Sequence, residues 1–378
     1  MRLAVYNAWT YVQGGMERML LELLRRSRHE CTLYTHLHAE ETYPELRSHR
    51  VVELPPRVSA RRSFGSIVSS AWTISRGVLP EADALLVSSD GFADLILARN
   101  RLPAACYCHT PLKILHDQTY RRALGRRDRR KAMALNVLGP AFNAVDIRLW
   151  RRYRHVFVGS TEVRRRLEAG GLVPSGPTEI LPPGVDLDWF SDDGLQRDDF
   201  FLFAGRIKWW KNIELAIAGF AEACRRGNPP PFIIAGGIDP FGGDYLESLR
   251  EMARGLPVTF EIDPTQERLR ELYRRCRALV FPTLNEDFGM VPLEAMACGA
   301  PVIAVDAGGP RDTIIPNVTG WLVGPTPEAF AVAMLDAAES NGKVELMRVA
   351  ARDRAMEFSW DRFVTRVDDV MEGIASSV

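Results

Sequence analysis

Two glutamates, Glu286 and Glu294, stand with seven residues between them around a turn that contains Gly289 and Pro292. Glycine permits a close approach of the backbone to a ligand, and proline fits the first turn of a helix, where backbone N–H groups lack partners. These donors and the positive end of the helix dipole together form a seat for an anion. The spacing therefore predicts that both acids face one ligand, although solvated surface acids near a helix start would show the same pattern.

Two cations, Arg206 and Lys211, flank the turn between an expected strand at 200–204 and the helix that follows it. If the start of that helix holds a pyrophosphate, both cations can reach it. A single arginine or lysine is most often a plain surface charge. The spacing of these two residues therefore leaves a phosphate site and a charged surface turn as alternatives.

The first half of the chain offers a histidine and a glycine pair. His109 follows the apolar run 104–108 and precedes Thr110-Pro111, while Gly14-Gly15 lies between an apolar run at 3–6 and a helical run. Ligands of parallel sheets bind beyond the carboxyl ends of the strands, where both candidates would lie. A structural histidine and a simple turn are the alternatives.

Short apolar runs alternate with helical runs along the whole chain, which predicts an α/β protein with doubly wound parallel sheets. The expected strands of the first half cover residues 3–6, 31–35, 50–54, 84–88, 104–108 and 156–158, with helices at 64–79 and 91–100 and one long helical region at 112–154. The expected domains are 1–181 and 200–357, joined by a linker at 182–199 and followed by a terminal helix at 358–378.

Composition excludes several classes of protein. A chain of 378 residues that is 46% hydrophobic and 25% charged can build two cores and is neither disordered nor fibrous. Its formal net charge is zero, so no basic excess indicates a nucleic-acid partner. The six cysteines lack paired metal spacings, which favours buried thiols in a reducing compartment. An opening strand pattern and the lack of an apolar run of about 18 residues predict a cytoplasmic protein.

Basic residues concentrate in two runs, Arg121–Lys131 and Arg151–Arg154. Such runs are usually solvated helix faces. Contact with an anionic membrane leaflet is the second interpretation of the first run, because about 1 kcal/mol for each basic residue would suffice for reversible attachment. The sequence leaves these two interpretations open.

Several of these motifs resemble those of glycosyltransferase family 4, a family of retaining enzymes. The stretch from Pro282 to Ala304 is similar to its Glu-x7-Glu signature, and Gly205-Arg206 followed by Lys211 resembles its phosphate-gripping motif. Tyr107–Pro111, Gly14-Gly15 and Phe358–Phe363 are similar to further segments of the family, so the resemblance covers nearly the whole chain. It implies the GT-B fold, in which two Rossmann-like domains face each other across a cleft and a C-terminal helix crosses back to the first domain.

The resemblance implies that a sugar moves from a nucleoside diphosphate sugar to an acceptor hydroxyl with retention at the anomeric carbon. Glu286 and His109 would be the catalytic residues, Asp287 and Phe288 would bind the donor sugar, and Glu294 would hold the ribose. The expected diphosphate-binding residues are Arg206, Lys211, Gly14, Gly15, Gly289, Met290 and Val291. No metal and no cofactor is expected, and Asp186-Leu187-Asp188 is interpreted as a structural part of the linker rather than a metal-binding D-x-D motif.

The donor base and the acceptor stay open. After the strand at 258–260 the family usually has a glycine and a small apolar residue, where this chain has Glu261–Pro264. The segments around His109 and Glu286 resemble those of bacterial surface-polysaccharide mannosyltransferases, which favours GDP-mannose over UDP-sugars as donor, with a lipid-linked glycan or a small molecule as acceptor. A sugar-nucleotide epimerase and an inactive sugar-nucleotide-binding subunit are rival functions. Nicotinamide-dependent oxidoreduction is disfavoured, because no G-x-G-x-x-G follows an expected strand.

Overall fold

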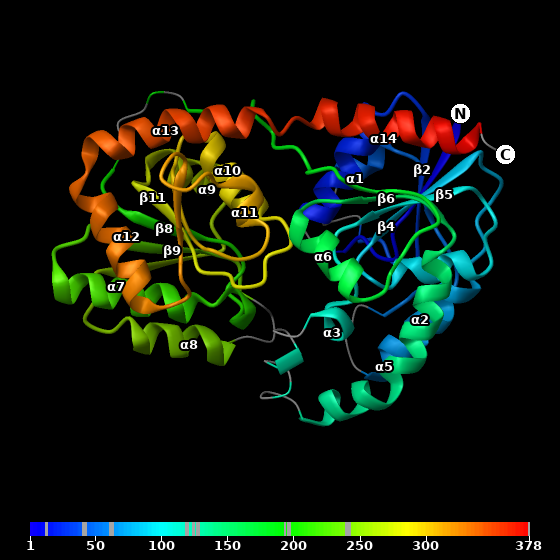
Figure 1. Cartoon of the computed structure of the whole chain (residues 1–378), viewed down its shortest axis with the longest axis horizontal. Coiled ribbons are helices and arrows are strands. Elements are labelled where there is room, and N and C mark those ends of the chain that lie inside the picture. Colours follow the sequence, from blue (N-terminus) through cyan, green and yellow to red (C-terminus); the bar gives the residue numbers. More distant parts are fainter. Residues whose placement is uncertain are drawn as a thin grey trace. The chain divides into compact units, whose positions relative to one another are not determined.

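The chain folds into two compact units (Figure 1). The computed structural model describes residues 1–11, 14–39, 44–59, 64–117, 121–122, 125, 129–192, 194, 198–238 and 243–376. Unit 1 consists of Met1–Gly184 and Trp360–Val378, and unit 2 consists of Val185–Ser359. The linker expected at 182–199 is therefore divided between the two units after Gly184.

Unit 1 is built on a parallel seven-stranded sheet with the order β3-β2-β1-β4-β5-β6-β7. The strands are β1 (Arg2–Tyr6), β2 (Glu30–Thr35), β3 (Val51–Glu53), β4 (Ala84–Ser89), β5 (Ala104–Cys108), β6 (Tyr153–Val158) and β7 (Thr178–Ile180). The strand order reverses between β1 and β4, so the connections that leave these two strands run in opposite directions. Such a switch point is the usual ligand position of an open parallel sheet.

The helices of unit 1 differ from the sequence prediction in two regions, because the helix expected at 91–100 is only a 3-10 turn, Ala93–Ala98, and the helical region expected at 112–154 is interrupted. They are α1 (Gly15–Arg26), α2 (Phe64–Arg76), α3 (Lys113–His116), α5 (Arg129–Trp150), α6 (Thr161–Ala169) and α14 (Trp360–Ala375), with 3-10 turns η1 (Pro44–Ser48) and η2 (Ala93–Ala98). The single helical region expected at 112–154 is wrong, because α5 ends at Trp150 and β6 begins at Tyr153. Arg152 holds the turn between them by donating to the carbonyls of Leu97 and Asn100.

Unit 2 contains a parallel six-stranded sheet with the order β10-β9-β8-β11-β12-β13. Its strands are β8 (Phe201–Ala204), β9 (Phe232–Gly236), β10 (Val258–Ile262), β11 (Ala278–Phe281), β12 (Val302–Val305) and β13 (Gly320–Val323). Its helices are α7 (Ile213–Arg226), α8 (Gly243–Met252), α9 (Gln266–Arg275), α10 (Met290–Ala297), α11 (Pro310–Thr313), α12 (Pro327–Glu339) and α13 (Asn341–Met356), with the 3-10 turn η3 (Trp209–Lys211).

Both faces of the unit 2 sheet are covered by helices. Phe201 and Phe203 belong to a core cluster with residues of α7 and α12, whereas Leu202 and Ala204 belong to a cluster with residues of α10. Successive side chains of a strand point to opposite faces, so alternate residues of β8 enter two different cores. This burial on both faces explains why the strands read as continuous apolar runs in the sequence.

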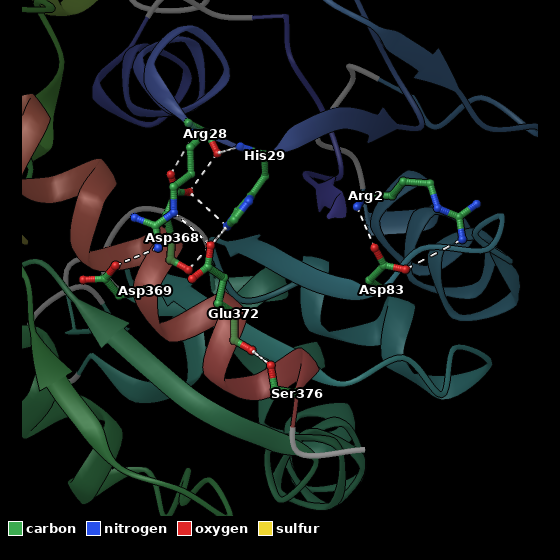
Figure 2. Close-up of polar contacts among 9 residues, drawn as sticks. Arg2, Arg28, His29, Asp83, Asp368, Asp369, Glu372 and Ser376 are labelled. Atoms are coloured by element: carbon green, nitrogen blue, oxygen red, sulfur yellow. Dashed lines mark hydrogen bonds and ion pairs between the residues drawn. The ribbon is translucent and has the colours of Figure 1, made fainter.

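The C-terminal helix α14 belongs to unit 1, which confirms its predicted return to the first domain. It packs against α1, β4 and β5, and Phe363 lies edge-on to Tyr107 with 5.3 Å between ring centroids. Figure 2 shows Arg28 extended toward the acidic face of α14, where it bonds Asp369 at 2.7 Å and Glu372 at 2.9 Å. No helix among the described residues is long and apolar enough to cross a membrane.

Candidate functional site

The switch point of the unit 2 sheet lies between β8 and β11, and the loops that follow these strands are joined by hydrogen bonds. Asn212 donates from its side-chain amide to the carbonyl of Pro282 at 3.2 Å, and Thr283 donates to the carbonyl of Lys211 at 3.4 Å. Asn212 adopts a left-handed conformation with φ 55°, which ends η3 and begins α7. The two loops therefore form one continuous rim at the carboxyl edge of the sheet.

Lys211 and Glu286, the expected phosphate ligand and the expected catalytic acid, form an ion pair on this rim. The Lys211 Nζ lies 2.6 Å from Glu286 Oε2, and the two side chains are 18% and 19% exposed. Arg206 follows β8 directly, is exposed, and makes no ion pair or hydrogen bond with any described residue. The rim therefore carries two cations and one carboxylate, a set suited to an anionic leaving group next to a developing positive charge.

Helix α10 begins at the position that the sequence predicts. Gly289 caps it with φ 98°, a backbone conformation that favours glycine, and the helix starts at Met290 and Val291. The Phe288 side chain is 7% exposed and packs against Phe358 with 5.9 Å between ring centroids, so it lies in the core. Any contact of Phe288 with a donor sugar would therefore come from its backbone.

A glycine pair after β12 braces the loop that carries Glu286. Gly309 donates its backbone N–H to the carbonyl of Glu286 at 3.0 Å. A Cβ atom at Gly308 would lie 2.5 Å from the Glu286 carbonyl oxygen, and one at Gly309 would lie 2.3 Å from the backbone of Phe288. The role of this pair could not be predicted from local sequence, because its partner lies more than 20 residues earlier in the chain.

Glu294, the expected ribose ligand, lies in the second turn of α10 and is 7% exposed. The Tyr273 hydroxyl donates to its Oε2 at 3.3 Å. This bond fixes the position of the carboxylate on the buried side of α10. Because α10 begins on the same rim, Glu286 and Glu294 belong to one end of the unit 2 sheet.

Unit 1 carries the remaining expected residues. Gly14 caps α1, and Gly15 is its first residue. His109 follows β5, and its Nε2 lies 2.9 Å from the Ser88 Oγ of β4. Burial lowers the pKa of His109 to about 3, so the imidazole is neutral at physiological pH. A neutral imidazole can donate one hydrogen bond and accept another, but it cannot supply a positive charge.

The structure thus brings the expected residues together in two groups, one on each unit. Unit 2 assembles Arg206, Lys211, Glu286 and Glu294 with the start of α10, and unit 1 holds Gly14, Gly15 and His109. Asp186 accepts from the backbone N–H groups of Asp188 and Trp189 at 3.2 and 3.0 Å, so this carboxylate shapes a turn. Among the described residues no group of three or more His, Cys, Asp or Glu side chains is arranged to hold a metal ion.

Comparisons with known proteins identify the family of the chain. The family model "Glycosyltransferase Family 4" matches residues 13–189, and the model "Glycosyl transferases group 1" matches residues 188–354. D-inositol 3-phosphate glycosyltransferase of Salinispora arenicola is 32% identical over an alignment covering 94% of this chain and 86% of the relative. The same-named protein of Salinispora tropica is 28% identical, covering 94% and 80%.

Solved structures show the same fold. HepE of Anabaena in complex with UDP superposes with a TM-score of 0.75 at 17% identity, covering 99% of this chain and 100% of that one. Sucrose-phosphate synthase of Thermosynechococcus elongatus gives a TM-score of 0.77 at 21% identity, with both chains fully covered. The fold is therefore GT-B, and the chain is a glycosyltransferase that belongs to glycosyltransferase family 4.

Proposed function

We propose that the enzyme transfers a sugar from a nucleoside diphosphate sugar to an acceptor hydroxyl with retention of configuration. The bond between the anomeric carbon and the diphosphate oxygen breaks, and its electron pair leaves with the diphosphate. The acceptor oxygen bonds the same face of the anomeric carbon, and its proton passes to the departing phosphate oxygen. The protein then has to stabilise negative charge on the diphosphate and positive character on the sugar.

The ion pair between Lys211 and Glu286 is the observation that carries this proposal. A bound diphosphate competes with Glu286 for the ammonium of Lys211, and Arg206 adds a second cation at the same rim. When Lys211 turns to the phosphate, the Glu286 carboxylate loses its partner and becomes available to the sugar. Donor binding therefore releases the acid that stabilises the cationic sugar, and no metal ion is needed for the charge balance.

Alanine variants of the two cations test the proposal. Each charge-assisted bond is worth about 1.5–3 kcal/mol, so Arg206→Ala and Lys211→Ala should each lower kcat/KM by about ten- to a hundredfold. Arg250→Ala and Lys343→Ala are matched controls, because these residues pair with Glu247 and Asp336 elsewhere in unit 2. Full activity of both rim variants with the true donor would refute the assignment.

The donor can be identified by a thermal-shift screen of UDP- and GDP-sugars. The relatives favour a UDP-sugar, since related structures contain UDP and UDP-glucose, while the sequence motifs favour GDP-mannose. The Glu261 carboxylate, near the end of β10 and beside the expected site of the nucleotide base, forms an ion pair with Arg268 at 2.7 Å. D-inositol 3-phosphate is the first acceptor to test because of the named relatives.

Product analysis then tests retention directly. Proton NMR of the first product formed shows whether the anomeric configuration of the donor is kept. An inverted product would refute the same-face mechanism. Incubation with donor alone addresses the epimerase alternative, because a glycosyltransferase leaves the donor sugar unepimerised when no acceptor is present.

We also propose that unit 1 attaches reversibly to an anionic membrane surface. Helices α2 and α5 both pack against η2, and both expose large apolar side chains. Trp72 of α2 is 64% exposed and lies beneath the Arg76 guanidinium at 5.1 Å, and Val137 of α5 is 71% exposed. Aromatic rings and basic groups together favour the interface of an anionic bilayer.

The basic run expected to make this contact is described only in part. Arg121 and Arg122 are exposed, whereas residues 126–128 and the side chains of Arg129–Lys131 lie outside the described part of the chain. In the second run Arg154 donates to the carbonyl of Ile374 at 3.2 Å, so this side chain has a structural role. Flotation with phosphatidylglycerol vesicles should recover the protein, and Trp72→Ser with Val137→Ser should reduce recovery. Equal flotation with neutral vesicles would refute the charge contribution.

A further inference from the structure

Three polar residues meet at the switch point of the unit 1 sheet. Asn7 follows β1, Ser88 lies near the carboxyl end of β4, and His109 follows β5. The strands are neighbours in the order β1-β4-β5, which brings together residues that are 81 and 21 positions apart. Asn7 and Ser88 are 2% and 0% exposed, so their hydrogen bonds are made in a nearly dry environment.

The orientation of the Asn7 amide is fixed by backbone groups. Its Oδ1 accepts from the backbone N–H of Trp9 at 3.1 Å, and its Nδ2 donates to the backbone carbonyl of Ser88 at 3.2 Å. If the amide were turned by 180°, its NH₂ group would face the N–H of Trp9, donor against donor, and its oxygen would face the carbonyl of Ser88, acceptor against acceptor. The group that faces the Ser88 hydroxyl at 3.3 Å is therefore the NH₂ group of Asn7.

The Ser88 hydroxyl has two side-chain partners, Asn7 Nδ2 and His109 Nε2. An NH₂ group cannot accept a hydrogen bond, so His109 Nε2 is the acceptor for the hydroxyl proton. If Nε2 carried a proton instead, the buried hydroxyl would face two donors and its own proton would be unpaired. That penalty lowers the population of such a tautomer by about ten- to a hundredfold.

We propose that Asn7 and Ser88 are positioning residues that hold His109 as the neutral tautomer with its proton on Nδ1. Burial, which lowers the pKa of His109 to about 3, prevents the doubly protonated form near neutral pH. Tyr107 supports the ring at 4.9 Å between centroids. No described residue bonds Nδ1, so this N–H is the donor that remains for an external oxygen.

This inference rests on the proposed function for the identity of that oxygen, which would belong to the donor sugar. Because Nδ1 always carries the proton, it favours a sugar oxygen that only accepts a hydrogen bond, or a sugar hydroxyl whose own proton points elsewhere. The hydrogen-bonded chain Asn7–Ser88–His109, here called the relay, thus sets the direction of one hydrogen bond to the sugar without adding charge to the site. An imidazole with its proton on Nε2 would present Nδ1 as an acceptor and would reverse that direction.

The tautomer can be measured without any substrate. Long-range ¹H–¹⁵N correlation spectra of protein labelled at its seven histidines separate a pyrrole-like nitrogen from a pyridine-like one, and His109→Gln identifies the signals of His109. We expect a pyrrole-like Nδ1 and a pyridine-like Nε2 that do not titrate between pH 5 and pH 8. A proton on Nε2 in the unmodified protein would overturn the proposal.

Two variants of the same shape separate the effect of the Ser88 hydroxyl from the effect of side-chain packing. Ser88→Thr keeps the hydroxyl and should keep the Nδ1–H tautomer, whereas Ser88→Val has the same shape and should lose the preference. With the true donor, kcat/KM of Ser88→Val should fall about tenfold below that of Ser88→Thr. Equal tautomer populations in the two variants would refute the relay.

The two proposals fail in different ways. An Nδ1–H tautomer that depends on the hydroxyl, in a protein that transfers no sugar from any donor, would support the relay and refute the proposed function. Sugar transfer by a protein whose His109 carries its proton on Nε2 would support the proposed function and refute the relay.

Discussion

A buried acid in unit 1 gives a prediction about stability. Asp146 of α5 is 1% exposed, and neither of its carboxylate oxygens has a hydrogen-bond partner among the described residues. Burial, together with the charge of Asp94, raises the pKa of Asp146 to about 9. Burial raises the pKa of Asp94 as well, to about 6, although Ser89 and Tyr153 donate to it at 2.6 Å each and favour its ionised form. Because the pKa of Asp146 is the higher of the two, Asp146 holds the proton at pH 7.

The sign of the effect follows from proton binding. The ordinary pKa of an aspartate is about 3.9, so between about pH 4 and pH 9 the folded protein holds a proton at Asp146 that the unfolded chain has released. The contribution of Asp146 to the free energy of unfolding therefore falls by about 1.4 kcal/mol for each pH unit in this window. Over the three units from pH 5 to pH 8 the loss is about 4 kcal/mol.

Asp146→Asn removes this dependence, because an amide of the same shape does not ionise. We expect the variant to gain stability over the unmodified protein as the pH rises, with about 4 kcal/mol more advantage at pH 8 than at pH 5. Urea unfolding followed by tryptophan fluorescence, with hydrogen exchange of α5 peptides, measures the gain. Glu168→Gln, an exposed carboxylate on α6, is the control. An advantage that stays constant from pH 5 to pH 8 would refute the reasoning.

Three further variants test the site and the C-terminal helix. Gly309→Ala places a Cβ against a backbone at 2.3 Å and should lower activity about a hundredfold, whereas Gly342→Ala, with open space around it, should not. Tyr273→Phe removes the bond to Glu294 and should raise the donor KM about fivefold; an unchanged KM would contradict the ribose assignment. Phe363→Ala should cost about 3–5 kcal/mol of unfolding free energy, and a loss below about 1 kcal/mol would show that α14 does not stabilise unit 1.

The sequence predicted the inner strands well, because they are short, apolar and buried on both faces, whereas the half-buried edge strand β7 was not predicted. The runs at 31–35, 84–88 and 104–108 correspond to β2, β4 and β5 to within one residue at each end. The helical pattern at 112–154 was misleading, since Arg151–Arg154 has the composition of a solvated helix but forms a turn and a strand start. The contacts that decide this, from Arg152 to Leu97 and Asn100, join segments more than 50 residues apart.

The candidate site was predictable where one short segment carries several of its residues. Glu286, Gly289 and Glu294 lie on a single loop and helix, so their spacing alone places them at one end of a sheet. The pairing of Glu286 with Lys211 was not predictable in this way, because it requires β8 and β11 to be neighbours. That adjacency follows from the strand order, which local sequence patterns do not contain.

The same reasoning explains why Asn7 and Ser88 escaped notice. Each is a common polar residue at the end of an apolar run, and nothing in its immediate neighbours distinguishes it from a turn residue. Their significance arises because β4 pairs with both β1 and β5, so the ends of three strands converge on His109. In a doubly wound sheet, residues that follow the strands on either side of the switch point therefore lie within reach of a histidine at that edge, even where they form no motif.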